Sequence, residues 1–561
     1  MNKLLRNAGF TGMMLLASFG TYAQTAAAKE TVPQGWHLLD KQNDGYYGIG
    51  VEKAYKELLK GRKSNTVIVA VIDSGIDTLH EDLKPILWKN AKEIPGNGID
   101  DDGNGYIDDV HGWNFIGGKD GRNVKEDSYE AARVYHNLKL KFGSTEGKDT
   151  SAWASDPEYA MWQKVRGNIE GSGKESQMQV AFLKNAYSNF KKSDEVMKTA
   201  MGKQQYTGAD LEKYEATTDE AKKARQTLLG IMKGNDMMDM TVDKFLEEFG
   251  NYLSGEEKKA EASNKAPRDY RGEIVKDNYA DFNDRYYGNN DIMANTPFHG
   301  THVSGIIGAK RGNNLGIDGV ADNVRIMTIR AVPDGDEHDK DIALAIRYAV
   351  DNGARVINMS FGKSFSPEKF WVDDAVRYAE SKGVLLVHAA GNDAKNVDVE
   401  DNFPNPNINV TKSRASNFIT VGASGDPKSG GITASFSNYG KDQVDVFAPG
   451  VKIYSTIPGG NTYGNAQGTS MASPVVAGVA ALILQYYPQL TGQQVKEIIE
   501  KSAVQPDIKV KTPGKGGEVE LSELSRTGGL VNAYEAIKLA DSMYGKSKSL
   551  PKSTMKSGKK Q

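Results

Sequence analysis

Apolar runs and helical patterns alternate in two separated parts of the chain. Residues 67–73, VIVAVID, form a continuous apolar run that ends in a carboxylate. An apolar run without polar alternation predicts a parallel strand covered on both faces. Further strands are predicted at 324–332, 354–360, 383–392, 418–423 and 444–447, with helices at 341–353 and 366–382 between the first of them. This order predicts βαβ units and an α/β fold with a doubly wound, mostly parallel sheet flanked by helices.

Between these parts, at residues 121–285, charges become dense and strand patterns disappear. The stretch TVDKFLEEFGNYL predicts a helix that Thr241 can cap and whose apolar residues share one face. Residues 176–200 and 224–234 also have helical patterns. We therefore predict a mainly α-helical subdomain inserted into the α/β domain. A peripheral decoration and a lid or exosite that limits access to the active site are both compatible with this position.

The two ends of the chain differ from the rest. Lys3 and Arg6 precede a short apolar run and small residues, the pattern of a secretory signal peptide over residues 1–23. Residues 541–561 are rich in Lys and Ser and are expected to be disordered. The α/β domain then comprises 24–120 and 286–540. The prediction is an exported protein, periplasmic or extracellular, without stable membrane insertion after the signal is removed.

Composition narrows the classes of function. With 39% hydrophobic and 25% charged residues, the chain is an ordinary globular protein. A formal net charge of −3 gives no reason to expect nucleic acid as a partner. The chain has no cysteine, which excludes disulfides, Cys-zinc sites and thiol catalysis. We expect a monomer.

Three segments carry candidate chemistry. Asp73 ends the first strand, His299 opens the helical segment FHGTHVSGIIGA, and Ser470 opens GTSMASPVVAGVA. Alone, Asp73 could be a turn residue with Asp77 as its rival, His299 half of an H-x-x-H pair, and Ser470 a helix cap. Together, a carboxylate, an imidazole and a hydroxyl are the components of an activated serine.

The segments DSGIDTLHEDL, HGTHVSGIIGA and GTSMASPVVAGVAALIL resemble the signature segments of the subtilisin-like serine proteases. The resemblance covers about 60–120 and 285–540 and implies a serine endopeptidase with Asp73, His299 and Ser470 as its triad. It also implies that Asn392, in HAAGN, is an oxyanion-hole donor. By the same resemblance, the substrate-binding residues are Ser360, Phe361, Gly362, Ala389, Ala390 and Gly391. The implied partners are protein or peptide substrates, and no organic cofactor is implied.

Oxygen-bearing side chains suggest structural calcium. Asp100, Asp102, Asn104 and Asp108 are spaced like ligands of an EF-hand loop, although His111 stands where that loop has its bidentate Glu. Asp109 or a residue from elsewhere would have to replace that ligand. D-G and N-G pairs also form ordinary turns. Separately, Asp82 in LHEDL resembles a family calcium ligand, with Asn313 and Asn314 as companions.

The family prosegment has no obvious counterpart. About 40 residues separate the signal peptide from the first strand, and VEKAYKELLKG within them has the pattern of a domain helix. We predict a secreted serine endopeptidase that forms an acyl-enzyme on Ser470. The alternatives are a catalytically silent binding protein on the same fold, an esterase, and a narrow processing protease gated by the insertion.

Overall fold

The computed structural model describes residues 32–143, 150–171, 173–234, 237–238, 240–294 and 297–545. The predicted signal peptide lies outside these ranges, as does the predicted tail from residue 546 onward. The last helix, α16 (Ala533–Tyr544), extends into the segment that the sequence assigned to the tail.

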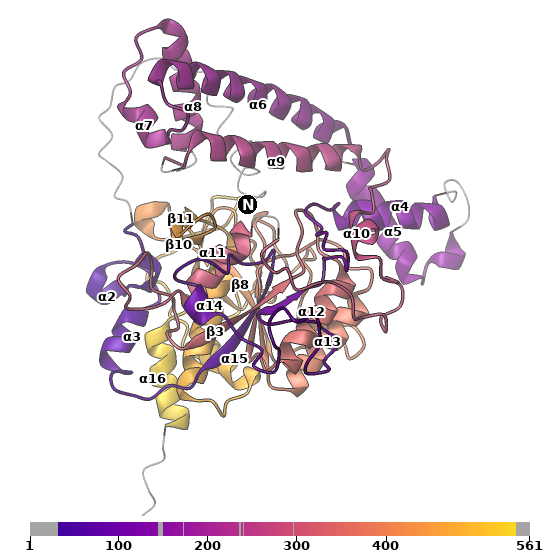
Figure 1. Ribbon diagram of the computed structural model, residues 1–561, viewed down its shortest axis with the longest axis vertical. Helices are drawn as coiled ribbons and strands as arrows, with labels where there is room; N and C mark the ends of the chain where they lie inside the picture. Colours follow the sequence, from indigo (N-terminus) through magenta and orange to yellow (C-terminus); the bar gives the residue numbers. More distant parts are fainter. Residues whose placement is uncertain are drawn as a thin grey trace, which may run out of the picture.

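A seven-stranded sheet forms the centre of the molecule (Figure 1). Its strand order is β2-β3-β1-β4-β5-β8-β9, and all neighbouring pairs are parallel. The strands are β1 (Val67–Asp73), β2 (Gly112–Asn114), β3 (Val324–Arg330), β4 (Val356–Met359), β5 (Leu385–Ala389), β8 (Phe418–Ser424) and β9 (Val446–Pro449). The large parallel sheet flanked by helices confirms the predicted α/β fold class.

The strand order changes direction at β1. From β1 the chain continues to β2 and β3 on one side, and then returns to β4 on the other side. Asp73 pairs with Arg330 of β3, and Ile72 pairs with Met359 of β4, so the three strands end at the same edge. In open α/β sheets, functional groups collect outside the carboxyl ends of the strands at such a switch point.

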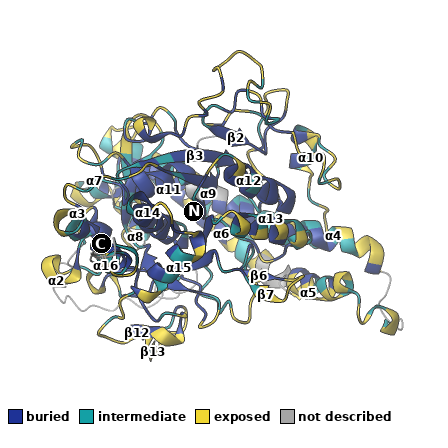
Figure 2. Ribbon diagram, turned by 90° about the horizontal axis from the view of Figure 1, so that it is seen from below, coloured by how far each residue is buried: buried dark blue, intermediate teal, exposed yellow. Residues whose placement is uncertain are grey.

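Helices cover both faces of the sheet. Alternate residues of β1 point to different apolar clusters: Val69 and Val71 to one, Ala70 and Ile72 to the other. The first cluster contains residues from α3 (Val51–Glu57), α11 (Phe298–Gly308), α14 (Thr469–Tyr486), α15 (Gly492–Lys501) and α16. The second contains residues from α12 (Asp339–Asp351) and α13 (Lys369–Ser381). Figure 2 shows the buried residues concentrated in the sheet and in α11, α12 and α14.

Helix α14 runs through the core. Among the described helices, it is the one long and apolar enough to cross a membrane, but 89% of its apolar window is buried inside the protein. Small residues let it approach its neighbours, since a Cβ at Gly478 would lie 2.6 Å from the Cβ of Val320. Within the described residues, burial therefore explains its apolar character.

The segment before β1 belongs to the core. The residues Trp36, Leu38, Ile49, Val51, Ala54 and Leu59 are buried in the same cluster as α14. Trp36 Nε1 donates to Val451 O at 3.1 Å, and Ala533 N donates to Ile49 O at 2.7 Å. Residues 36–59 are thus an integral part of the α/β domain and not a separate unit.

Residues 121–285 form helices and pack around two apolar clusters, of which the second also includes Phe365 of the α/β domain. The helices are α4 (Glu130–Phe142), α5 (Pro157–Gly171), α6 (Gly173–Met201), α7 (Gly208–Lys213), α8 (Asp219–Gly234), α9 (Val242–Glu261) and α10 (Tyr270–Val275). Thr241 caps α9 through its side chain, and Phe245 and Phe249 are buried against α6 and α8. Helices α4 and α5 pack around a separate cluster that includes Trp162 and Val165.

The described residues also contain the short helix α2 (Lys41–Asp44) and three short hairpins. The hairpins are β6 (Asn407–Ile408) with β7 (Ser413–Arg414), β10 (Ile453–Ile457) with β11 (Thr462–Ala466), and β12 (Val510–Lys511) with β13 (Glu518–Val519).

Candidate active site

Asp73 and His299 are hydrogen-bonded at the end of β1. The Asp73 side chain is almost fully buried and accepts from Ser74 N at 2.7 Å. His299 Nδ1 lies 2.8 and 2.9 Å from the two carboxylate oxygens. Because a carboxylate only accepts, Nδ1 carries the proton and Nε2 is left as the acceptor. The His299 side chain stays 24% exposed, so this acceptor can be reached from solvent.

A glycine allows the first turn of α11 to lie against the loop after β1. A Cβ at Gly300 would lie 2.0 Å from Gly75 O and 3.2 Å from the Cβ of Asp73. No side chain fits at that distance, so the glycine after His299 is required for the imidazole to reach the Asp73 carboxylate. The close contact between α11 and the loop after β1 therefore explains why a glycine follows His299 in the sequence FHG.

Ser470 is the second residue of α14 and is tied to the end of β4. Its Oγ donates to Ser360 O at 3.2 Å, while Ser360 Oγ donates to Ser470 O at 2.9 Å. Asn358 links the same strand to the helix, since its Nδ2 donates to Ser360 Oγ and its Oδ1 accepts from Ser473 Oγ. Among the described residues, the Ser470 hydroxyl bonds to this carbonyl and not to His299. A hydrogen bond between a catalytic serine and its histidine often forms only when substrate is bound.

The orientation of Asn392 is fixed by a neighbour of Ser470. Asn392 Oδ1 accepts from Thr469 N at 2.8 Å and from Thr469 Oγ1 at 2.9 Å. A backbone N–H can only donate, so the amide oxygen must face Thr469 and the Nδ2 donors must point elsewhere.

Two donors converge beside Gly468. The position of a Cβ at Gly468 lies 3.5 Å from Asn392 Nδ2, 3.6 Å from Ser470 N and 3.7 Å from Asn392 Oδ1, and this oxygen already accepts from Thr469. The second N–H of a helix has no partner within the helix, and the helix dipole also favours negative charge there. A small anionic atom beside Gly468 would therefore meet a side-chain donor and a backbone donor together.

The predicted substrate-binding segments follow two neighbouring strands. Ser360, Phe361 and Gly362 follow β4, while Ala389, Ala390 and Gly391 end and follow β5. Asn402 connects them: its Nδ2 donates to Ala390 O at 3.0 Å, and its Oδ1 lies 2.7 Å from the position of a Cβ at Gly362. The structure thus brings both predicted walls to the same edge as Ser470.

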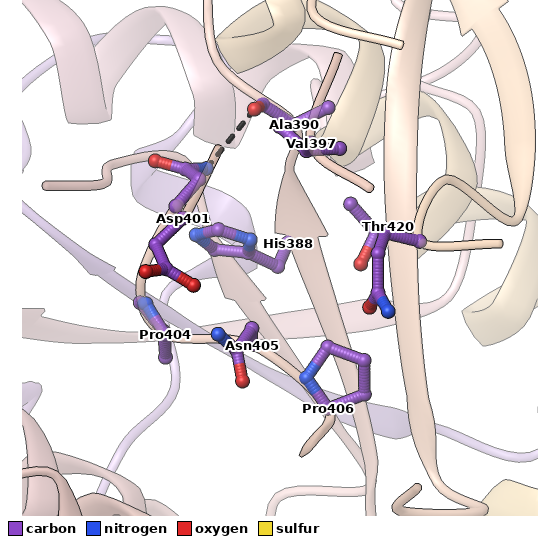
Figure 3. Close-up of a pocket in the computed structure, with 10 residues that line it drawn as sticks. His388, Ala390, Val397, Asp401, Pro404, Asn405, Pro406 and Thr420 are labelled. Atoms are coloured by element: carbon purple, nitrogen blue, oxygen red, sulfur yellow. Dashed lines mark hydrogen bonds between the residues drawn. The ribbon is translucent and has the colours of Figure 1, made fainter. Parts of the chain in front are cut away.

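A pocket opens behind the second wall (Figure 3). His388 lies in it and its Nε2 bonds to Phe361 O at 2.8 Å. The lining residues are His388, Ala390, Val397, Asp401, Asn402, Pro404, Asn405, Pro406, Thr420 and Gln443. The dashed bond in Figure 3 is that from Asn402 to Ala390 O, so the pocket adjoins the link between the walls.

The candidate metal ligands fall into two groups. Carboxylate oxygens of Glu93, Asp100 and Asp102 lie within 4.8 Å of one another. Asn104 is beside them and donates to Asp109 Oδ2, whereas Asp108 accepts from the backbone N–H groups of residues 96–98.

In the acidic loop, backbone N–H groups already donate to each of the three carboxylates: Asp101 N to Glu93 at 3.0 Å, Gly105 N to Asp100 at 2.8 Å and Asn104 N to Asp102 at 3.1 Å. At the Asp82 site the donors are side chains. One Asp82 oxygen accepts from Asn313 Nδ2 and the other from Tyr463 OH at 2.9 Å. Asn313 Oδ1 accepts from Leu315 N, so the nitrogen of this amide, and not its oxygen, faces Asp82. Protein donors therefore already satisfy the carboxylate.

Sequence reasoning missed two residues of this region, Thr469 and Glu93; it placed the floor of the substrate pocket around Asn402 and Phe403 but did not foresee that Asn402 connects the two walls. Thr469 stands next to Ser470, and a fully buried Thr at a helix start is a signal for a side-chain hydrogen bond. Glu93 precedes the acidic loop by seven positions, so no spacing rule for an EF-hand would include it.

At the switch point of the sheet, an Asp at the end of β1 is bonded to a His on α11, and a serine stands at the start of the central helix; these are the components of a serine-hydrolase site on an α/β fold. Residues 64–529 match the model of the Subtilase family. The chain therefore belongs to the subtilase family, whose members are serine-type endopeptidases.

Two curated serine proteases of similar sequence support this class. The chain is 41% identical to the thermophilic serine proteinase of Bacillus sp. strain AK1 over 236 residues, which are 42% of this chain and 52% of that protein. It is 39% identical to subtilisin DY of Bacillus licheniformis over 206 residues, which are 36% of this chain and 70% of that protein. A solved protease structure from Pseudoalteromonas arctica PAMC 21717 has 32% identity and a TM-score of 0.35, covering 43% of this chain and 70% of that chain. The chain thus spans about half of the first relative.

Proposed function

We propose that the chain is a secreted serine endopeptidase in which Asp73, His299 and Ser470 form the catalytic triad. The observation that carries the proposal is the contact of His299 Nδ1 with both Asp73 oxygens, at 2.8 and 2.9 Å. It holds the imidazole in the tautomer whose Nε2 can take a proton from a serine. Export rests on the N-terminal sequence, in which Lys3 and Arg6 precede an apolar run.

In the proposed reaction, Ser470 Oγ attacks the scissile carbonyl carbon while its proton moves to His299 Nε2. The C–N bond then breaks, and the imidazolium gives this proton to the leaving amine. An ester joins the acyl part of the substrate to Ser470. Water attacks this ester with His299 as the base, which releases the acid and restores the hydroxyl. Asp73 stays ionised and stabilises the imidazolium.

The oxyanion of each tetrahedral intermediate would lie beside Gly468. Asn392 Nδ2 and Ser470 N both approach this point. Donors held in place before the reaction stabilise the developing charge without having to reorganise, and this is commonly the largest contribution of such a site. The role of Asn392 is supported by the orientation that Thr469 imposes on its amide.

Protein or peptide chains are the proposed substrates. The backbone of the segment 360–362 can pair with an extended chain by β-strand addition. Residues 389–391 would form the opposite wall of the pocket for the side chain before the scissile bond. Gly391 suits this role because its φ is 104° and a Cβ there would lie only 2.4 Å from Asn438 Nδ2, which leaves no room for a side chain.

We also propose structural calcium at the acidic loop. Two ligands of one calcium ion lie at most about 5 Å apart, because Ca–O distances are about 2.3–2.6 Å. The 4.8 Å spread of Glu93, Asp100 and Asp102 meets this limit. When bound, the ion would neutralise these carboxylates and hold the loop. At Asp82, the donors Asn313 and Tyr463 would first have to move aside.

Labelling with a fluorophosphonate probe separates the proposed enzyme from a silent binding protein. We expect the wild type to be labelled and Ser470→Ala to remain unlabelled. Digestion of unfolded casein then separates a peptidase from an esterase. A folded wild type without labelling would refute the enzyme, and labelling without proteolysis would favour the esterase.

A further inference from the structure

The start of the helical insertion is paired with a strand-like segment of the α/β domain. Asp334 N donates to Lys125 O at 2.8 Å, and Asp127 N donates to Asp334 O at 3.0 Å. Asp336 continues the contact, since its N donates to Ser128 O at 3.2 Å and its carboxylate accepts from Glu130 N at 2.9 Å. The insertion thus begins on a fixed backbone.

A buried ion cluster joins this start to the candidate substrate wall. Lys363, directly after Gly362, has a side chain that is 1% exposed, and its Nζ lies 2.7 Å from Glu130 Oε2 and 2.8 Å from Asp339 Oδ1. Arg133 donates to the same Glu130 at 2.7 Å. Burial alone would raise the pKa of Glu130, but the charges of Lys363 and Arg133 lower it below its usual value. Breaking such a buried pair is costly, so helix α4 is held firmly to the wall.

Apolar contacts also join the helical insertion to the α/β domain. Phe365 is buried in the cluster of α4 and α5, together with Trp162 and Val165. Ala262, the residue that ends α9, is buried in this cluster as well. Lys164 of α5 forms an ion pair with Asp401, which lines the pocket beside the second wall. One end of α9 is therefore fixed next to the segment that follows Ser360.

The other end of α9 lies next to His299. Lys244, in the first turn of α9, places its Nζ 5.9 Å from the ring centre of Phe298, the residue before His299. Helix α9 has 20 residues and is therefore about 30 Å long. Figure 1 shows it crossing above the α/β domain from the side of α11 to the side of α4 and α10, and in Figure 2, viewed at right angles, it overlaps α11.

From this geometry we propose that α9 and the helices packed on it form a fixed bridge over the active site, so that the substrates are extended, unfolded polypeptides and not folded proteins. This inference rests on the proposed endopeptidase function. A helix with its side chains is about 10–12 Å wide, and α6 and α8 widen the bridge further. A folded domain is stopped by this obstacle, whereas a flexible chain can lie beneath it.

The test uses two folded domains joined by a flexible linker that contains one cleavage sequence. The same sequence is also assayed as a short chromogenic peptide. A fully extended linker of 8 residues spans only about 28 Å, comparable to the length of α9, whereas one of 30 residues reaches much further. For the wild type, we expect kcat/KM for the 30-residue linker within several-fold of that for the peptide, and at least tenfold lower values for the 8-residue linker.

Glu247→Pro breaks the bridge, and Glu247→Ala is its control. The Glu247 side chain is 59% exposed on α9, where Pro disrupts the helix and Ala does not. We expect the Pro variant to reduce the difference between the two linkers at least fivefold and the Ala variant to keep it. An unchanged ratio in a labelled Pro variant would overturn the bridge. Loss of peptide cleavage and labelling in the wild type would instead refute the enzyme function.

A second measurement does not depend on the Pro variant. Because the chain has no cysteine, Glu247→Cys and Leu79→Cys introduce two unique sites for spin labels. Leu79 is 69% exposed in the α/β domain. A narrow single distance between the labels would support a fixed bridge, and a broad distribution would overturn it.

Discussion

Thr469→Val tests how the oxyanion site is built. Thr469 is fully buried, and its Oγ1 donates to Asn392 Oδ1 at 2.9 Å and accepts from Gly391 N at 3.0 Å. Valine has almost the same shape but can do neither. The bond from the backbone N of residue 469 to Asn392 remains. The variant therefore loosens the amide of Asn392 without removing it.

The effects of Thr469→Val on stability and on kcat can be estimated from these contacts. A hydrogen bond between neutral groups contributes about 1 kcal/mol, and a buried N–H left without a partner costs about 1–3 kcal/mol. Because Gly391 is only half-buried, its N–H contributes the lower part of this range, and we expect a loss of about 2 kcal/mol in the free energy of unfolding. Removing a whole oxyanion donor lowers kcat by about 10²–10³, so a loosened donor should lower it by about 10–100 and leave KM nearly unchanged.

A double-mutant cycle with Asn392→Ala isolates the coupling. If Thr469 acts through Asn392, Thr469→Val lowers kcat in the wild-type background but has little further effect once Asn392 is Ala. The assay is hydrolysis of a chromogenic peptide, with unfolding in urea to measure stability. Additive losses in kcat would refute the reasoning, because Thr469 would then act independently of the Asn392 amide.

Other expected outcomes concern stability. Burial, with the charge of His299, lowers the pKa of His302 to about 4. The unfolded chain binds a proton at this residue below about pH 6.5, so His302 alone should lower the stability by about 3 kcal/mol between pH 6.5 and 4. Burial also lowers the pKa of His37, to about 3, so His302→Leu should make the dependence in urea unfolding less steep without removing it. An equally steep dependence in the variant would contradict it. Lys363→Met removes one of the two cations that contact the buried Glu130, which keeps Arg133, and it also removes the cation beside Asp339; it should cost about 3–5 kcal/mol. Adding Glu130→Gln should restore part of this loss, and a double variant as unstable as the single one would argue against the ion cluster. Adding Ca²⁺ at about 100 times its Kd should stabilise the wild type by about 2.7 kcal/mol in thermal unfolding. Asp102→Asn should lose most of this gain. An equal shift of Tm by Ca²⁺ in the wild type and in the variant would exclude this site.

Much of the fold could be predicted because the sheet is parallel and buried. The run 67–73 coincides with β1, and the pattern at 341–353 lies within two residues of α12 at each end. The predicted helix that Thr241 caps is α9, whose apolar face is buried as expected. Continuous apolar runs and capping residues are local signals, so sequence reasoning can recognise them.

The relation between distant segments could not be predicted. The contacts of Glu130 with Lys363 and of Lys244 with Phe298 join residues far apart in the chain, and no local pattern pairs them. The sequence placed the insertion between Asp73 and His299 but could not say which of its helices lies near the site. In the acidic loop, Glu93 joins the cluster only because the chain turns back on itself.

The most direct test of the central claim is to trap the acyl-enzyme. A slowly hydrolysed ester substrate is mixed with the protein, the reaction is stopped in acid, and the digested protein is analysed by mass spectrometry. We predict an acyl group on the peptide that contains Ser470, formed rapidly by the wild type and not detectably by His299→Ala. An acyl group on another residue, or equal formation in both proteins, would contradict it.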